Sequence, residues 1–103
     1  MHIEIDKTAI PYRFDMELAG ELFTFEVHYN ERFDFFTVGL EKDGEVVVAG
    51  EKMVLNEPLF YQLNDPRLPK VLLIPMDESN NEARITWANL GSSVLLQVGE
   101  LVT

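Results

Sequence analysis

The fold is decided by residues 29–50, which read YNERFDFFTVGLEKDGEVVVAG. Asn30–Glu31 predicts one chain reversal, because asparagine tolerates the left-handed backbone that such turns often need. Asp43–Gly44 predicts a second reversal and is the strongest local hairpin signal in the chain. Aromatic and β-branched residues predict a strand over 32–40 between the turns and another over 45–55 after them. The stretch therefore predicts an antiparallel hairpin.

The residues before this hairpin alternate apolar and polar side chains at the period of a half-buried strand. Strands are expected over 12–18 and 23–29, joined by a tight turn at Ala19–Gly20. Turns near 20, 30 and 44 fit an antiparallel meander and not a series of strand–helix–strand units. Residues 1–11 are expected to form an arm that contains a short strand.

Two of the predicted strands carry apolar residues on both faces. On the 32–40 strand these residues alternate in two sets, Phe36, Val38 and Leu40 on one face and Phe33, Phe35 and Thr37 on the other. Val46–Val48 is apolar without interruption. One face builds the core, and the other must be covered by a second sheet, by the rest of the chain or by a partner. Gly50 predicts a bulge or a close backbone approach.

After Leu55 the pattern becomes less regular. The predicted segments are, in order, a helical turn or an apolar plug over 57–63, a stiff connector over 65–69, a buried strand over 71–74 ended by Pro75, and a polar loop over 77–82. Thr86–Gly91 predicts a short helical turn near 86–90, capped by Thr86 and closed by Gly91 with positive φ. A last strand is expected over 93–98, continued by Leu101–Val102.

These elements predict a mainly β fold. The expected architecture is a small antiparallel β-sandwich or barrel-like domain of about six to eight strands. The 103 residues suffice for one compact domain, which is expected to span residues 1–103. The chain has no cysteine, which excludes disulfides, thiolate metal sites and cysteine catalysis.

The charge of the chain is strongly acidic, with a formal net charge of −10. Residues 1–60 hold 13 of the acidic residues and 5 of the basic ones. Such a domain repels phosphate backbones, so nucleic-acid binding is not expected. The acidity serves either solubility or a basic partner surface. No apolar run approaches the roughly 20 residues of a membrane span, and the N-terminus lacks the pattern of a signal peptide.

The sequence offers no pattern of residues that carries chemistry. The two histidines, His2 and His28, have no metal-ligand spacing, and residues 77–82 lack the spacing of a calcium loop. No serine lies in a nucleophile-elbow sequence and no glycine-rich phosphate loop is present. We therefore predict no enzyme, no catalytic residue, no metal site and no cofactor. Trp87 and the aromatic residues of 33–36 are expected in the core, with a sugar-binding surface as the other interpretation.

Several features occur together in an order that resembles a known family. They are Tyr29-Asn30-x-Arg32, an aromatic residue at Phe36, Asp43–Gly44, Gly50, Asp65-Pro66-Arg67-Leu68-Pro69, and Leu90–Gly91 before an apolar terminal strand. Over residues 12–98 the chain is similar to the baseplate plug family of tailed phages, whose namesake is a cyanophage baseplate plug protein.

The resemblance implies a non-enzymatic structural component of a phage or prophage tail baseplate hub. Its expected partners are the hub and spike proteins, and a homo-oligomer is left open. Its expected place is the virion tail or a phage-tail-like particle, and the host cytoplasm during assembly. The residues expected to serve as interface or structural anchors are Asn30, Arg32, Phe33, Phe35, Val47 and Arg67. Arg32 and Arg67 lie beside turns, where a guanidinium can fix a carboxylate or backbone carbonyls.

Two other functions remain open on the sequence alone. One is a free acidic regulatory protein that occupies a basic surface on a partner, such as a nucleic-acid enzyme. The acidic residues are interleaved with Arg13, Arg32 and Lys52, which weakens that interpretation. The other is a small carbohydrate-binding β-domain.

Overall fold

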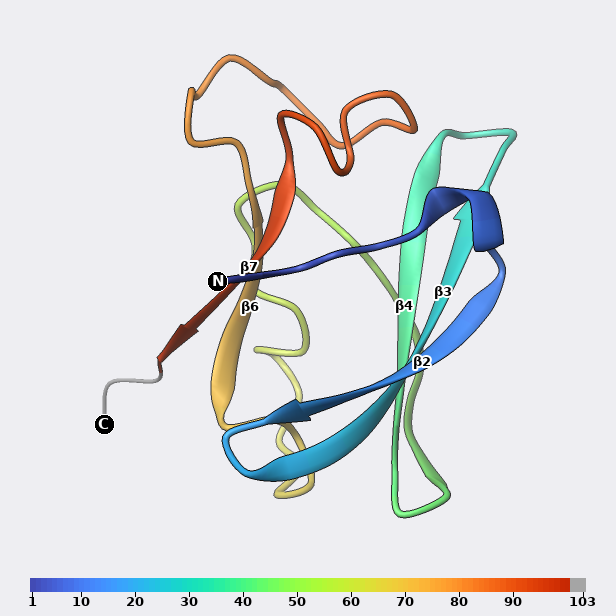
Figure 1. The fold of residues 1–103 in the computed structure, drawn as a ribbon, viewed down its shortest axis with the longest axis vertical. Coiled ribbons are helices and arrows are strands. Elements are labelled where there is room, and N and C mark those ends of the chain that lie inside the picture. The colour runs from blue at the N-terminus through green and yellow to red at the C-terminus, as the bar shows by residue number, and fades with distance from the viewer. Residues whose placement is uncertain (101–103) are drawn as a thin grey trace.

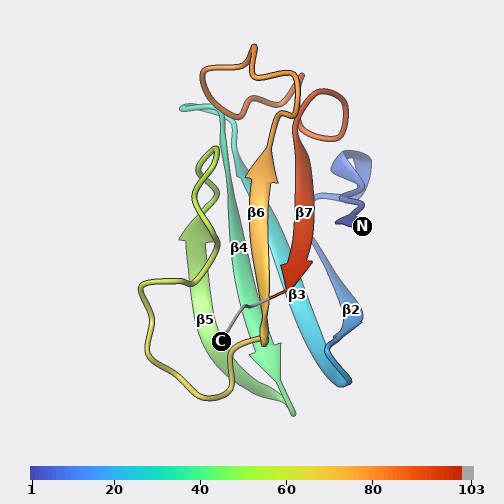
Figure 2. The same ribbon diagram turned by 90° about the vertical axis from the view of Figure 1, so that its left-hand side faces the viewer.

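The computed structural model describes residues 1–100 and arranges them as two antiparallel β-sheets that face each other (Figures 1 and 2). The elements are β1 (His2–Ile3), the 3-10 turn η1 (Lys7–Ala9), β2 (Tyr12–Leu18), β3 (Glu21–Asn30), β4 (Phe35–Lys42), β5 (Glu45–Lys52), β6 (Val71–Met76) and β7 (Leu95–Glu100). The larger sheet has the strand order β2-β3-β4-β5, and the smaller has the order β1-β7-β6. The predicted mainly β sandwich is confirmed. The predicted strand continuation at Leu101–Val102 lies outside the described residues.

The larger sheet is the predicted meander. Ala19 and Gly20 have φ values of 51° and 80°, and Asp43 and Gly44 have 53° and 80°. Positive φ at both central residues defines type I′ turns, whose twist matches that of the strands they join. The two hairpins predicted at these dipeptides are therefore confirmed.

The reversal between β3 and β4 differs from the prediction. The strand expected over 32–40 begins only at Phe35, because residues 31–34 form a four-residue loop instead of a turn at Asn30–Glu31. The Asn30 side chain accepts a hydrogen bond from the Phe33 backbone N–H at 3.0 Å. Asp34 has a φ of 55°, a left-handed conformation outside the extended region of a regular strand, and β4 begins after it.

The pairing of β4 with β5 contains the irregularity predicted near Gly50. Leu40 pairs with Val48 but Val38 pairs with Glu51, so β5 inserts an extra residue there, and a second shift lies between Leu40 and Glu41. Val47 and Val48 therefore both lie half-buried against the core, whereas Val46 stays 61% exposed. The bulges thus explain how the consecutive residues Val47 and Val48 both contact the core.

The strand predicted over 45–55 ends at Lys52, and the chain then crosses to the smaller sheet. Asn56 has a φ of 65°, which turns the backbone away from β5. Leu59 and Phe60 are buried, and the Leu59 N–H donates to the Leu73 carbonyl at 2.7 Å. Of the two predictions for 57–63, the apolar plug is confirmed, because this segment forms turns and no helix.

The prediction that Pro75 ends its strand is wrong. β6 continues to Met76, and Pro75 pairs in register with Leu96. The Pro75 carbonyl accepts the Asn56 N–H at 2.7 Å, so the backbone polar groups of Pro75 face away from β7. Because β6 is an edge strand, the missing N–H of proline removes no hydrogen bond between β6 and β7.

The core lies between the two sheets and is built from both. Phe36, Val38 and Leu40 are buried, as predicted for one face of their strand. The other fully buried or nearly buried apolar residues are Ile3, Leu18, Phe23, Phe25, Val27, Met53, Leu59, Phe60, Leu73, Ile85, Leu90, Val94 and Leu96. The arm takes part, since Ile3 is buried where β1 pairs with β7.

Candidate functional site

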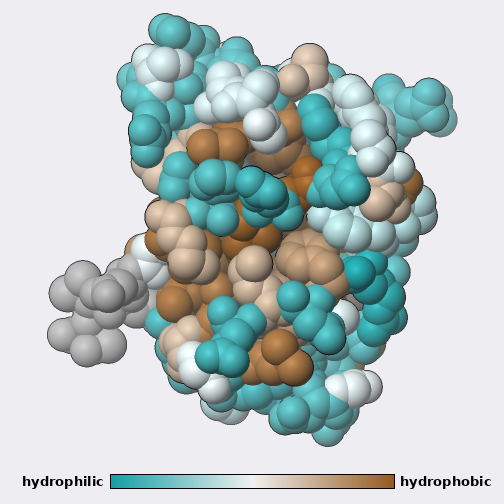
Figure 3. All heavy atoms as spheres, viewed as in Figure 1, coloured by the Kyte–Doolittle hydropathy of each residue, from teal (hydrophilic) through white to brown (hydrophobic). Residues whose placement is uncertain are grey.

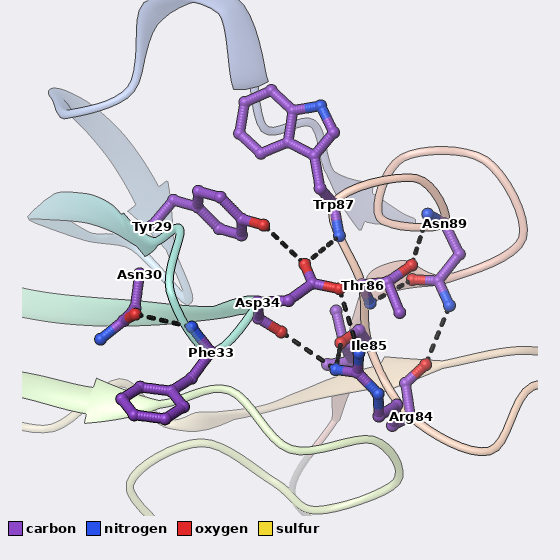
Figure 4. Close-up of polar contacts among 9 residues, drawn as sticks. All are labelled: Tyr29, Asn30, Phe33, Asp34, Arg84, Ile85, Thr86, Trp87 and Asn89. Carbon is purple, nitrogen blue, oxygen red and sulfur yellow. Dashed lines mark hydrogen bonds and ion pairs between the residues drawn. The ribbon is translucent and has the colours of Figure 1, made fainter.

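Asp34 holds together two segments that are 50 residues apart in the sequence (Figure 4). Its Oδ1 atom accepts hydrogen bonds from the Tyr29 hydroxyl at 2.7 Å and from the Trp87 backbone N–H at 2.9 Å. Arg84 donates to Oδ2 of Asp34 at 3.0 Å and to its carbonyl oxygen at 3.0 Å. The β3–β4 loop is therefore fixed to the segment that leads into β7.

These contacts set the ionisation of the pair. The hydrogen bond from Tyr29, followed by those from the Trp87 N–H and Arg84, lowers the pKa of Asp34. The same hydrogen bond to Asp34 is the largest cause that raises the pKa of Tyr29 to about 12. At neutral pH the carboxylate is charged and the phenol keeps its proton. The carboxylate oxygens accept hydrogen bonds from Tyr29, Trp87 and Arg84, so the arrangement holds the loop in place.

The segment that receives Asp34 is a reciprocally capped turn. The Asn89 N–H donates to Oγ1 of Thr86 at 3.1 Å, and the Thr86 N–H donates to Oδ1 of Asn89 at 2.7 Å. The Leu90 N–H bonds to the Thr86 carbonyl at 3.2 Å, and Gly91 has a φ of 91°. The predicted cap and positive φ are confirmed, and the predicted helical turn is a single hydrogen-bonded turn. β7 starts after this turn, at Leu95, and not at residue 93 as predicted.

Trp87 joins this turn to the core and to the arm. Its ring stacks on Phe36 with centroids 5.9 Å apart and lies 4.8 Å from the ring of Tyr29. Lys7 of the arm donates to the Trp87 carbonyl at 2.5 Å and lies 5.4 Å from the ring centroid. The indole is 41% exposed. Trp87 and Phe33 point to different sides of Asp34, so they form no shared aromatic platform (Figure 4).

Four of the six predicted anchor residues gather at the β3–β4 end of the sandwich. Phe33 is 65% exposed, and the Arg32 guanidinium lies 5.2 Å from its ring centroid. Phe35 is half-buried, with Nζ of Lys52 at 4.9 Å from its ring centroid. Asn30 caps the loop that carries Phe33, through the hydrogen bond described above.

A shallow hollow of about 150 Å³ adjoins these aromatic side chains. Its lining includes Phe33, Phe35, Lys52 and Val54, and Val54 is 37% exposed. We call these four residues, together with Arg32 over the Phe33 ring, the aromatic patch. Arg84, which fixes the Asp34 loop, also lines the hollow. The patch can accept an apolar side chain, and its cations can face a carboxylate or carbonyl oxygen.

The other two predicted anchors lie apart from the aromatic patch. Val47 is half-buried on β5 and packs against the core. Arg67 donates through Nε and Nη2 to the two carboxylate oxygens of Asp65 at 3.1 and 2.7 Å. This hydrogen bonding is the largest cause that lowers the pKa of Asp65 to about 2. Arg67 also lies 3.5 Å from Glu45, next to the β4–β5 turn at the opposite end of the sandwich (Figure 1).

Sequence reasoning missed Asp34, Arg84 and Asn89. The spacing from Thr86 to Asn89 is that of a capping box with asparagine in place of glutamate, so this part of the site had a readable signal. No sequence signal indicated the pairing of Asp34 with Arg84, because this contact depends on how two distant loops meet. Among residues 1–100, no group of three or more potential metal ligands comes together. None of the helical structure in this range is long and apolar enough to cross a membrane.

The comparisons with known proteins agree with the resemblance described above. A family model described as cyanophage baseplate Pam3 plug gp18 matches residues 1–100. No curated protein and no solved structure matches the chain. The family match covers all but three residues of the 103. The chain therefore belongs to the cyanophage baseplate plug family, and its role is that of a structural component of a phage tail baseplate.

Proposed function

We propose that the chain is a non-enzymatic part of the baseplate hub that acts by binding the neighbouring hub and spike proteins. Membership of the baseplate plug family supports a structural role in the virion tail. We further propose that the chain resides in the host cytoplasm during assembly, before it joins the particle.

The observation that carries this proposal is the exposure of Phe33 on a loop that is held rigid. Phe33 is 65% exposed, yet its backbone N–H is capped by Asn30 and the next residue is Asp34, which three side-chain or backbone donors fix. An aromatic side chain on a fixed loop loses little conformational entropy when a partner covers it. Such residues are frequent among those that dominate protein–protein affinity.

The charge of the aromatic patch sets it apart on an acidic chain. Arg32 and Lys52 lie over the rings of Phe33 and Phe35, and neither forms an ion pair within residues 1–100. A partner that covers Phe33 would remove most of its side chain from water, which is worth about 1–2 kcal/mol. That free energy corresponds to a roughly 5- to 30-fold gain in affinity.

The test is to replace Phe33 with aspartate and to measure how much of the chain is retained in purified tail particles. We expect Phe33→Asp to lower its ratio to hub and spike proteins at least 5-fold, in line with that estimate. Val46→Asp is the matched control, because Val46 is 61% exposed but lies at the β4–β5 end. Circular dichroism verifies that both variants fold.

Equal retention of both variants would remove the aromatic patch from the interface. Phe35→Asp and Val47→Asp extend the test to the other predicted interface residues. Loss of binding by Val47→Asp together with loss of folding would assign Val47 to the core and not to the interface.

A further inference from the structure

β2 is an edge strand of the larger sheet, and its unpaired backbone groups belong to alternate residues. The type I′ turn at Ala19–Gly20 makes Leu18 and Glu21 a hydrogen-bonded pair, and pairs of this kind recur every second residue. The even-numbered residues of β2 therefore bond to β3. The N–H and carbonyl groups of Arg13, Asp15 and Glu17 point away from the sheet, where a further strand would lie.

The core-facing side chains of β2 are only partly covered. Tyr12, Phe14 and Met16 are half-buried, although the equivalent residues of β3 are buried. The cause is the unequal size of the sheets, since the smaller sheet has three strands and its β1 has only two residues. Phe14 stacks on Tyr12 and on buried Phe25 with centroids 5.3 and 5.4 Å apart. Figure 3 views this side and shows hydrophobic residues at the surface between the sheets.

The outward side chains beside this edge are mainly acidic. Glu17 and Asp15 are exposed, and Asp15 accepts a hydrogen bond from the Thr24 hydroxyl at 2.7 Å. Arg13 is engaged by Glu41 and lies 4.0 Å from Glu26. One cation thus faces four carboxylates on this part of the sheet. The charge selects an occupant with lysine or arginine opposite Asp15 and Glu17, since like charges directly opposite destabilise a strand pair.

A second copy of the chain fits this edge poorly. Antiparallel self-pairing over the whole free edge places Asp15 opposite Asp15 of the copy, and each copy carries a formal net charge of −10. The same register sets Arg13 opposite Glu17, but Arg13 is already engaged by Glu41.

The occupant of this edge must match the acidic outer surface and must cover the half-buried apolar side chains of β2. A segment in which basic and apolar residues alternate does both. Its basic residues face the acidic outer surface, and its apolar residues cover Phe14 and Met16.

We propose that β2 binds an extended segment of another protein as a fifth strand of the larger sheet, and that basic and apolar residues alternate in this segment. In the virion the segment would belong to a baseplate neighbour, and this source rests on the proposed function above. The binding property itself does not depend on that source. It can therefore be tested on the isolated chain.

The first experiment uses the synthetic peptide Lys-Val-Lys-Val-Lys-Val-Lys and residue-resolved amide hydrogen exchange. At a free peptide concentration of ten times its dissociation constant, exchange at Arg13, Asp15 and Glu17 should slow about 11-fold. The N–H groups of Phe14 and Met16 already bond to β3, so they are protected before peptide is added and do not report on the free edge. The control peptide has glutamate in place of each lysine and should protect none of these amides.

Three outcomes would overturn the proposal. They are equal protection by the two peptides, no protection by either, and a concentration-dependent dimer of the chain that protects the same amides without peptide. Glu17→Lys should weaken the lysine peptide at least 5-fold, and Glu78→Lys, an exposed loop glutamate, should leave its affinity unchanged. Circular dichroism confirms that each variant is folded.

The second experiment separates this proposal from the proposed function. Tail particles are prepared with the double variant Asp15→Lys/Glu17→Lys and with Glu78→Lys. If the double variant is absent from the particles and Glu78→Lys is retained, strand addition within the baseplate is supported. Retention of both variants would overturn that use of the edge while the hub assignment stands. Absence of the wild-type chain from particles would overturn the hub assignment, and the peptide experiment would still decide on β2.

Discussion

Gly39 lies beneath the bulge of β5, and its replacement by alanine tests the packing of the larger sheet. A Cβ atom at Gly39 would lie 2.9 Å from the Ala49 carbonyl oxygen and 3.3 Å from that of Val48. Both atoms belong to the backbone of β5, so no side chain can rotate away and β5 itself must move. We expect Gly39→Ala to destabilise the fold by about 1–3 kcal/mol, the usual cost of an added methyl group in a tightly packed site.

Gly50 in the same bulge is the matched control. A Cβ atom there would have the Thr37 Cβ atom as its nearest neighbour, at 4.0 Å, which is an ordinary contact. Gly50→Ala should leave stability unchanged or raise it by about 0.4–1 kcal/mol, because alanine restricts the unfolded chain more than glycine does.

The assay for the two variants is thermal unfolding followed by circular dichroism. For a domain of this size each kcal/mol corresponds to a shift in Tm of about 4–8 °C, so Gly39→Ala should melt well below the wild type and Gly50→Ala should not. The displacement of β5 should also move Lys52, which lies over the Phe35 ring, and so disrupt this contact within the aromatic patch. Equal Tm values for the two variants would refute the close approach of β5 to Gly39.

Two further predictions concern ionisation. Asp34→Asn removes the charge that holds the phenolic proton, so the pKa of Tyr29 should fall from about 12 toward the ordinary value of 10 in an NMR pH titration, and an unchanged value would show that Asp34 is not its partner. The pKa of Asp77 is lowered to about 2, chiefly by the Ser79 hydroxyl and also by backbone N–H groups including those of Asn81 and Glu82. Because a lowered folded-state pKa stabilises the protein above the unfolded value of 3.8, this stabilisation should be lost as the pH falls from about 4 to 2. Asp77→Asn should flatten the dependence of Tm on pH in that range, and an unchanged slope would contradict the assigned contacts.

The features that the sequence predicted correctly are local ones. The two reversals were predicted at Ala19–Gly20 and Asp43–Gly44, where each glycine accepts a positive φ without steric cost. Alternation placed Phe36, Val38 and Leu40 on one face of their strand, and the structure buries all three. Each of these inferences needs only a few neighbouring residues. The expectation that Phe33 and Trp87 lie in the core is wrong, because they are 65% and 41% exposed.

The errors and omissions arose where distant segments meet. The start of β4 depends on Asp34, whose partner Arg84 lies 50 residues away. Pro75 remains within β6 because an edge strand has a side without ladder bonds, and edge position is a property of the whole sheet. The half-buried side of β2 likewise results from the small size of the opposite sheet, which no local pattern reports.

The family match connects the chain to a phage tail baseplate, and quantitative mass spectrometry of purified tail particles from the source strain tests that connection most directly. The account predicts that the chain co-purifies with hub and spike proteins in a fixed ratio that repeats between preparations. Complete, infectious particles that lack the chain would contradict it. The family match would then describe only ancestry and fold, and a free acidic protein that binds a basic surface would become the leading function.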